Sequence, residues 1–410
     1  MNWLDGWLRD ARGVGREFWK FYIAALCVDI GFAMYLFLYS LFLLDLGFDE
    51  RQIGLVAGAM TIGAMVGTLP AGVLAERFGL RPILLTGFVM TPAICAVRPF
   101  FPSEHAQIGM AFLTGLFLCT WHMGYCPATA ALTNEENRTF GFSMMFSTGI
   151  STGALAGLMG GVLPGWLMRT HIGLHAVDAK RVVLLLCCAI YALGIWPAWK
   201  LRLSYAGERR GPWRFDPFLY RYLPAIALWS LAAGAFVPFA QVFLAHQVRL
   251  PLVRIGEVFS AGQIVQVAAI LLAPLFFRRC GLVAGIAYTQ AVSGLALAGL
   301  AGAHGMPGAV TLYVAFMAIH WMAGPGIYSL LMDRVQESAR SSASAANIFT
   351  TSLCQAIASA AAGAAYVHFG YPKVLGAIAA VAVFSSGWFW LLLRDRRAAH
   401  AVATATADAN

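Results

Sequence analysis

Long apolar segments constrain this chain more than any other feature, and twelve of them are long enough to cross a bilayer. A helix needs about 20 apolar residues to span the hydrocarbon core. Strands are not expected, because the alternating segments of about ten residues that build a membrane barrel do not recur. The predicted spans are 19–44, 52–75, 82–101, 106–132, 139–166, 182–200, 218–245, 255–277, 282–302, 308–332, 341–367 and 371–393.

Composition agrees with a membrane protein. Hydrophobic residues make up 60% of the chain and charged residues only 11%, whereas soluble proteins are about 25% charged. A soluble fold of this composition would expose large apolar patches. The sequence therefore predicts an all-α polytopic membrane protein with the lipid bilayer as its surroundings.

The loops predict the orientation of the chain. Its formal net charge is +9, and the basic residues fall in short loops between apolar segments, so we expect no nucleic-acid partner. With the N-terminus inside, twenty Lys and Arg lie on the inner side and eight on the outer side, which satisfies the positive-inside rule. We therefore expect a multi-pass protein of the plasma (inner) membrane, with a retained first span and both termini cytoplasmic.

Two similar halves are visible in the sequence. Residues 201–217 are the longest polar connection and separate six spans from six. We expect an N-terminal bundle over 1–200, a cytoplasmic linker over 201–217, a C-terminal bundle over 218–394 and a disordered tail over 395–410. At an offset of 202 residues, Ile53-Gly54 matches Ile255-Gly256 and Arg77-Phe-Gly-Leu matches Arg279-Cys-Gly-Leu. Such an internal repeat is typical of transporters.

Eight cysteines show no metal-ligand spacing, and Cys187-Cys188 are adjacent. Seven of the eight sit within apolar segments, where we interpret them as small packing residues. We therefore predict no metal site and no cofactor.

The stretch from Pro70 to Pro82 is a short polar turn between two apolar segments. Polar backbone of this kind is not tolerated in hydrocarbon, so it should lie at a membrane face. Its pattern Gly-x-Leu-Ala-acid-Arg-x-Gly-x-Arg resembles the signature loop of the major facilitator superfamily, with Glu76 where that family more often has Asp. The resemblance implies twelve transmembrane helices in two six-helix bundles related by a pseudo-two-fold axis. It also implies secondary active transport by alternating access.

The same resemblance implies a cytoplasmic gate in which charged residues hold the inner side shut in the outward-facing state. Gly72 and Gly79 would allow close helix contact and a tight turn. A turn and topology signal without any gating role is the alternative, and helix-end stabilisation is another for the acid–Arg pairs. The predicted gate residues are Gly72, Glu76, Arg77, Gly79, Arg81, Glu135, Arg138, Glu337 and Arg340.

Asp29 is the most informative single residue, because it lies near the middle of the first span. Placing a carboxylate there costs at least about 2.5 kcal/mol on insertion scales. A low dielectric favours the protonated form, so Asp29 could take up and release a proton. Binding a substrate, pairing with a basic group and a structural hydrogen bond remain open alternatives.

Polar and aromatic residues near mid-depth suggest a cavity for a neutral or amphipathic small molecule. Polar residues between helices also serve simply to hold helices together, and a histidine or tryptophan can be an ordinary packing residue. The predicted cavity residues are Tyr35, Tyr39, Trp121, His122, Tyr125, Gln241, Gln263, Gln266, His320, Trp321, Asn347, Thr351 and Gln355. Arg98 could attract an anion or extend to the interface.

Two sequence features of the superfamily, one in the fourth span and one in the fifth, are absent or incomplete in this chain. The fourth span has no Arg near Gly124, and the glycines of the fifth span match the antiporter motif only in part because Leu158 replaces its Pro. Export is therefore not predicted over uptake.

We expect a monomer that moves a small molecule, with protons as the candidate coupling ion, and no enzymatic activity. A polytopic enzyme acting on a lipid-linked group is the alternative from another class, and a non-transporting receptor or channel is a third. Short loops and the lack of a nucleotide-binding motif disfavour the enzyme.

Overall fold

The computed structural model describes residues 13–134, 137–170, 174–203, 216–303, 305–336 and 339–394. Within these ranges the secondary structure is helical, without strands. The helices are α2 (Arg16–Asp45), α3 (Glu50–Phe78), α4 (Leu80–Val97), η1 (Arg98–Phe100), α5 (Glu104–Ala131), α6 (Arg138–Thr170), α7 (Ala176–Leu193), α8 (Ile195–Trp199), α9 (Leu219–Phe236), η2 (Val237–Phe239), α10 (Ala240–His246), α11 (Leu252–Cys280), α12 (Leu282–Ala301), α13 (Met306–Arg334) and α14 (Arg340–Leu393).

Eleven helical segments in the described ranges are long and apolar enough to cross a membrane. The last of them, α14, has 54 residues and is interrupted at Gly370, where φ is 74° and ψ is 163°. A helix of 20 residues already spans about 30 Å, so α14 contains two crossings. Counted in this way the described residues make twelve crossings, as the apolar segments predict.

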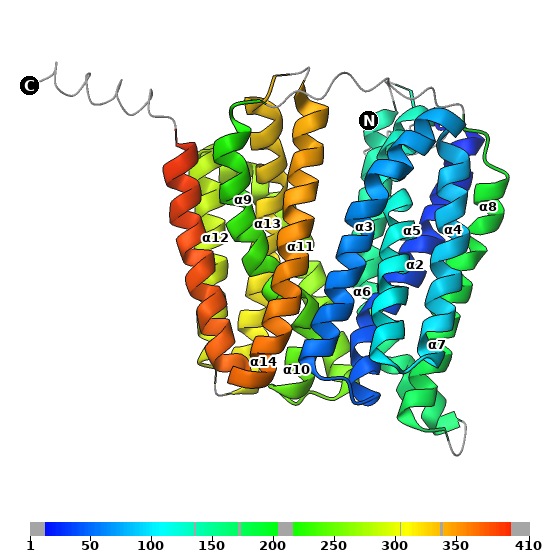
Figure 1. Cartoon of the computed structure of the whole chain (residues 1–410). Helices are drawn as coiled ribbons and strands as arrows, with labels where there is room; N and C mark the ends of the chain where they lie inside the picture. The colour runs from blue at the N-terminus through cyan, green and yellow to red at the C-terminus, as the bar shows by residue number, and fades with distance from the viewer. Residues whose placement is uncertain are drawn as a thin grey trace, which may run out of the picture.

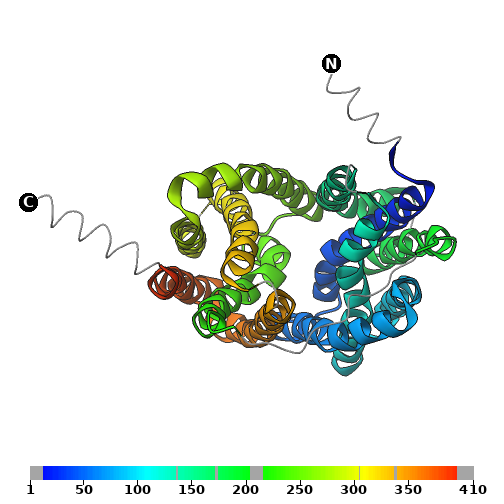
Figure 2. The ribbon, with the colours of Figure 1, turned by 90° about the horizontal axis from the view of Figure 1, so that it is seen from above.

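The crossings form two groups. Helices α2 to α8 lie side by side in one group and α9 to α14 in the other (Figures 1 and 2). We call the end where α2 begins the inner end, which the loop charges predict to be cytoplasmic, and the opposite end the outer end. Most of the predicted linker, the first twelve residues and the predicted tail (204–215, 1–12 and 395–410) lie outside the described residues.

The internal repeat is visible in the backbone. The turn between α3 and α4 is the single residue Gly79, with φ 88° and ψ 160°. The turn between α11 and α12 is the single residue Gly281, with φ 79° and ψ 152°. Glycine adopts this region without steric cost. The predicted tight turn is therefore confirmed, and its copy in the second half has the same shape.

Small residues hold the two halves together at the outer end. Gly54 of α3 meets the backbone of α14 at Ser359, and Gly256 of α11 meets the backbone of α6 at Gly157. Two serines fasten these contacts: the Ser359 hydroxyl donates to the carbonyl of Gly54 at 3.0 Å, and Ser260 donates to the carbonyl of Ala154 at 2.6 Å. Inside a bilayer, close packing of this kind replaces the hydrophobic effect as the source of helix association.

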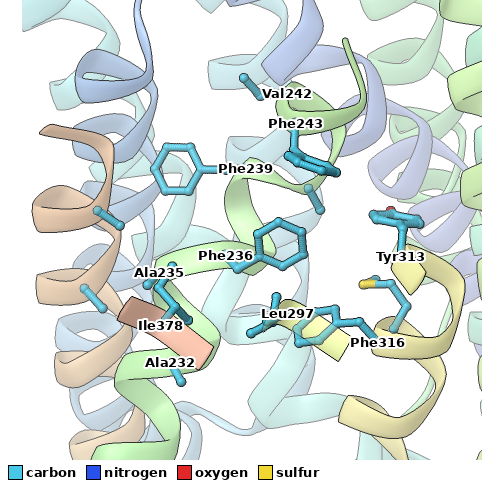
Figure 3. Close-up of a cluster of buried hydrophobic side chains, with 14 of the residues drawn as sticks. Ala232, Ala235, Phe236, Phe239, Val242, Phe243, Leu297, Tyr313, Phe316 and Ile378 are labelled. Atoms are coloured by element: carbon cyan, nitrogen blue, oxygen red, sulfur yellow. The ribbon is translucent and has the colours of Figure 1, made fainter. Parts of the chain in front are cut away.

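The C-terminal half has its own aromatic core. The crossing from α9 to α10 bends at η2, where Phe236 faces α13 and Phe239 points to the opposite side, toward α14 (Figure 3). Phe236 packs edge-on against Phe316, with ring centroids 5.0 Å apart. Both side chains are almost completely buried. This core fixes the bent crossing within its own half.

Lys180 shows how a charge is accommodated where α7 approaches α2. Its ammonium group lies 2.7 Å from the Asp45 carboxylate and donates to the carbonyl of Leu41 at 3.2 Å. The lysine is buried. A cation at the last turn of α2 also interacts favourably with the helix dipole.

Replacing Lys180 with methionine should destabilise the protein by about 1–3 kcal/mol, because the Asp45 carboxylate and the Leu41 carbonyl lose their donor. We expect the apparent melting temperature in detergent to fall by a few degrees. Arg254→Ala is the control, since Arg254 and Glu257 form an exposed pair at 2.7 Å of a type that contributes about 0–1 kcal/mol. Equal melting temperatures for both variants would contradict a stabilising role for Lys180.

Candidate substrate site between the two halves

Asp29 lies thirteen residues into α2, about 20 Å from the inner end of that helix. Its carboxyl group is half-buried and within hydrogen-bonding reach of the Trp121 side chain of α5. A Cβ atom on Gly149 of α6 would lie 3.6 Å from one of its oxygens. The carboxyl group therefore has an indole within reach and a glycine, which carries no side chain, next to it.

Aromatic rings surround this carboxylate. Trp121 packs against Phe21, Phe88 and Tyr125, each with ring centroids 5.8 Å away. Tyr125 is half-buried and lies near both Asp29 and Tyr328 of α13. Because Tyr328 belongs to the other half, this aromatic group extends from one half toward the other.

His122 and four polar residues of the C-terminal half are the other candidates for this site. His122 follows Trp121 on α5 and is exposed. The Gln263 amide of α11 lies directly over Gly153 of α6 and so crosses between the halves. Half-buried Thr351 and Gln355 of α14 remain candidate cavity residues, as does Gln266, whose side-chain oxygen is buried without a partner.

Tyr35 and Tyr39 do not fit the cavity role predicted for them. Both are buried inside the N-terminal half and stack on each other at 4.8 Å. Tyr35 donates to the carbonyl of Cys95 at 3.0 Å, and Tyr39 donates to the side-chain oxygen of Gln107. Arg98 lies over the Tyr39 ring at 4.2 Å and is 2% exposed. Arg98 therefore does not extend to the interface.

His320 and Asn347 also belong to the interior of their half. His320 is stacked on Trp229 at 4.9 Å and on Phe316 at 5.2 Å. Asn347 is buried and accepts a hydrogen bond from the Tyr222 hydroxyl at 3.1 Å. We do not retain these two residues in the proposed cavity. Trp321, which is 43% exposed, and half-buried Gln241 of α10 stay predictions.

The described gate residues lie at the inner end, and the following contacts of Arg77, Arg81 and Arg340 stay within single halves. Arg81 donates to the carbonyl of Trp199 in α8, and Arg340 donates to the carbonyl of Met332 at 3.2 Å. Arg77 lies over the Phe78 ring at 5.3 Å. Gly72 is buried, whereas Glu76 and Arg138 are exposed. Glu135 and Glu337 lie outside the described residues.

Sequence reasoning missed the contacts that close the outer end. The glycines of the fifth span indicate close packing, but their partners in α11 do not follow from one segment alone. The repeat did contain a signal for these contacts: the offset of 202 residues aligns Gly157 with Ser359 and Gly161 with Gly363, so small residues recur at equivalent positions of the two halves.

A helical membrane protein with two repeated halves, joined at one end and with a half-buried acid and aromatic rings at mid-depth, has the architecture of a transporter. Comparison with known families supports this class: residues 21–359 match the family model described as "Major Facilitator Superfamily". The chain therefore belongs to the major facilitator superfamily.

Among curated proteins, the chain is 27% identical over 203 residues to the multidrug resistance protein MdtH of Salmonella typhi, and it is equally similar to that of Salmonella typhimurium. The match covers 49% of this chain and 48% of the relative, so it spans about half the length of each.

Solved structures share the fold over nearly the whole chain. The nucleoside transporter NupG superposes with a TM-score of 0.75 at 14% identity, covering 93% of this chain and 100% of that one. A peptide transporter of the POT family gives 0.76 at 12% identity, covering 93% and 98%. A bacterial homologue of the lysosomal transporter Spinster, described as inward-facing and occupied, gives 0.71 at 12% identity, covering 92% and 96%.

Proposed function

We propose that the chain is a secondary active transporter that moves a small molecule by alternating access, with Asp29 carrying the coupling proton. One observation carries the proposal: a half-buried carboxylate at mid-membrane depth, in reach of Trp121, beside rings that extend toward the other half. An acidic residue at this depth usually has a function, because placing its charge in the bilayer costs free energy.

The close backbone contacts at the outer end support an inward-facing conformation for this structure. The Spinster homologue that shares the fold is described as inward-facing as well. In the proposed cycle, the halves separate at the outer end and approach at the inner end, where Glu76, Arg77, Arg81, Arg138 and Arg340 form the gate. The orientation follows from the basic loops, so both termini are cytoplasmic in this proposal.

The proposed substrate is a small amphipathic compound. Aromatic rings and amides around one carboxylate suit a molecule with a large apolar surface and few polar groups. The similarity to MdtH, which is named a multidrug resistance protein, points in the same direction. We propose that the monomer in a bacterial inner membrane is the working unit.

Two experiments in sequence test this function. A thermal-stabilisation screen of the purified protein against amphipathic drugs, nucleosides, peptides and organic acids identifies a ligand. Proteoliposomes with an imposed proton gradient then measure movement of that ligand. We expect movement against its concentration gradient that stops when a protonophore dissipates the proton gradient. Movement that only equilibrates the ligand, with or without the protonophore, would contradict active transport.

A further inference from the structure

A histidine and a glutamate meet across the two halves at the outer end. Glu50 opens α3, and His246 closes α10. Their side chains approach to 2.7 Å between the Glu50 Oε1 and His246 Nδ1 atoms. The Tyr371 hydroxyl donates to the same Glu50 oxygen at 3.2 Å. Three elements from two halves therefore converge on one carboxylate oxygen.

The surroundings favour opposite charges on this pair. Glu50 lies in the first turn of α3 and His246 in the last turn of α10. A helix dipole stabilises an anion at the first position and a cation at the second. The Glu50 side chain is only 13% exposed, whereas that of His246 is 50% exposed and reachable by protons. Gly363 of α14 meets the Glu50 backbone beside the pair, so the contact lies within the interface that closes the outer end.

We propose that Glu50 and His246 form a proton-binding site at the outer end, separate from Asp29, whose protonation stabilises the closed outer end. The inference rests on the proposed alternating access. Histidine is the ordinary side chain that changes charge between about pH 5 and 8. When His246 is protonated it forms an ion pair with Glu50, and when it is neutral a weaker hydrogen bond remains. Acid outside the membrane therefore favours the inward-facing state.

The charged side chains that neighbour Glu50 in the sequence have other partners. The Asp49 side chain accepts from the backbone N–H of Gln52 at 2.8 Å, and Arg51 pairs with Glu104 at 3.5 Å. The repeat provides no second copy, since Leu252 occupies the position in α11 equivalent to Glu50. The other Asp, Glu, Lys, Arg and His residues described on the elements at the outer end are Asp45, Arg98, His105, Arg169, His175, Asp178, Lys180, Arg181, Arg249, Arg254, Glu257, His368 and Lys373.

The test measures distances between two spin labels at the outer end, at Ser103→Cys and Gly305→Cys, with other cysteines that react with the label replaced by serine. Both positions are exposed and precede the outer starts of α5 and α13. Partly exposed ion pairs contribute modestly, so we expect the population with a long outer distance to fall roughly two- to fivefold between about pH 8 and about pH 5.5.

The variants identify the titrating group. In His246→Gln and in Glu50→Gln this pH response should disappear, whereas His368→Gln and His105→Gln should keep it. A His246→Gln protein that responds to pH as its parent does would overturn the proposal, and so would a parent without any response. Two outer distances with constant populations would contradict only the proton site. A single outer distance at every pH would contradict alternating access as well.

Discussion

Gly157→Leu should abolish outer closure and reduce transport by about ten- to a hundredfold. A Cβ atom at Gly157 would lie 2.5 Å from the Ser260 hydroxyl and 2.8 Å from the carbonyl of Gly256, both on α11 of the other half. A backbone carbonyl cannot move aside, so the larger side chain is accommodated only if the halves separate. Overpacking of this kind costs about 1–3 kcal/mol, and each 1.4 kcal/mol is about a factor of ten.

The same helix supplies a matched control. Gly165→Leu places the same side chain on α6 where nothing lies within 4 Å of the new Cβ atom. We expect Gly165→Leu to transport at nearly the parental rate. Transport by proteoliposomes and the melting temperature of each variant are the measurements. If Gly157→Leu transported as well as Gly165→Leu, the glycine contact would not be the closed outer gate.

Asp29→Asn should remove uphill accumulation, by at least a factor of about ten, because a carboxamide cannot release and rebind a proton. It keeps the size of the side chain and can still accept from Trp121. We therefore expect exchange of labelled for unlabelled substrate to survive, since exchange needs the site but no net proton movement. Loss of exchange as well as accumulation would instead assign Asp29 to substrate binding.

Asp178→Asn is the control for this variant. Asp178 pairs with Arg181 at 2.6 Å near the outer start of α7, where its side chain is 45% exposed. We expect accumulation to be unaffected by its replacement. Proton-driven accumulation that is unchanged in Asp29→Asn would remove Asp29 from the coupling role.

Hydropathy predicts most of the fold, because crossing a bilayer imposes a length and an apolar composition on each helix. The break between the last two spans was expected between 367 and 371, and the structure places it at Gly370. The largest shift in a helix start concerns α7, which begins at Ala176 rather than 182. Its first turns carry Lys180, whose charge is neutralised by Asp45, and a hydropathy rule cannot anticipate that pairing.

The site was only partly predictable, because residue spacing shows which side chains share a helix face but not which other helix packs against that face. Trp121 was expected near the site, and the structure puts it within reach of Asp29. Tyr35 and Tyr39 stack on each other, but they contact Arg98 and Gln107 inside the N-terminal half rather than the predicted cavity. Composition alone does not distinguish a polar cluster inside one half from a polar wall between halves.

The central claim is that the outer end opens when the inner end closes. Two label pairs, each in its own variant with the other reactive cysteines replaced by serine, test it directly: Ser103→Cys with Gly305→Cys at the outer end, and Phe78→Cys with the native Cys280 at the inner end. We expect each pair to show two distances, one short and one long. The fraction of molecules with the short outer distance should equal the fraction with the long inner distance. Gly157→Leu should lower both fractions. Outer and inner distances that stay fixed, or that lengthen together, would contradict the account.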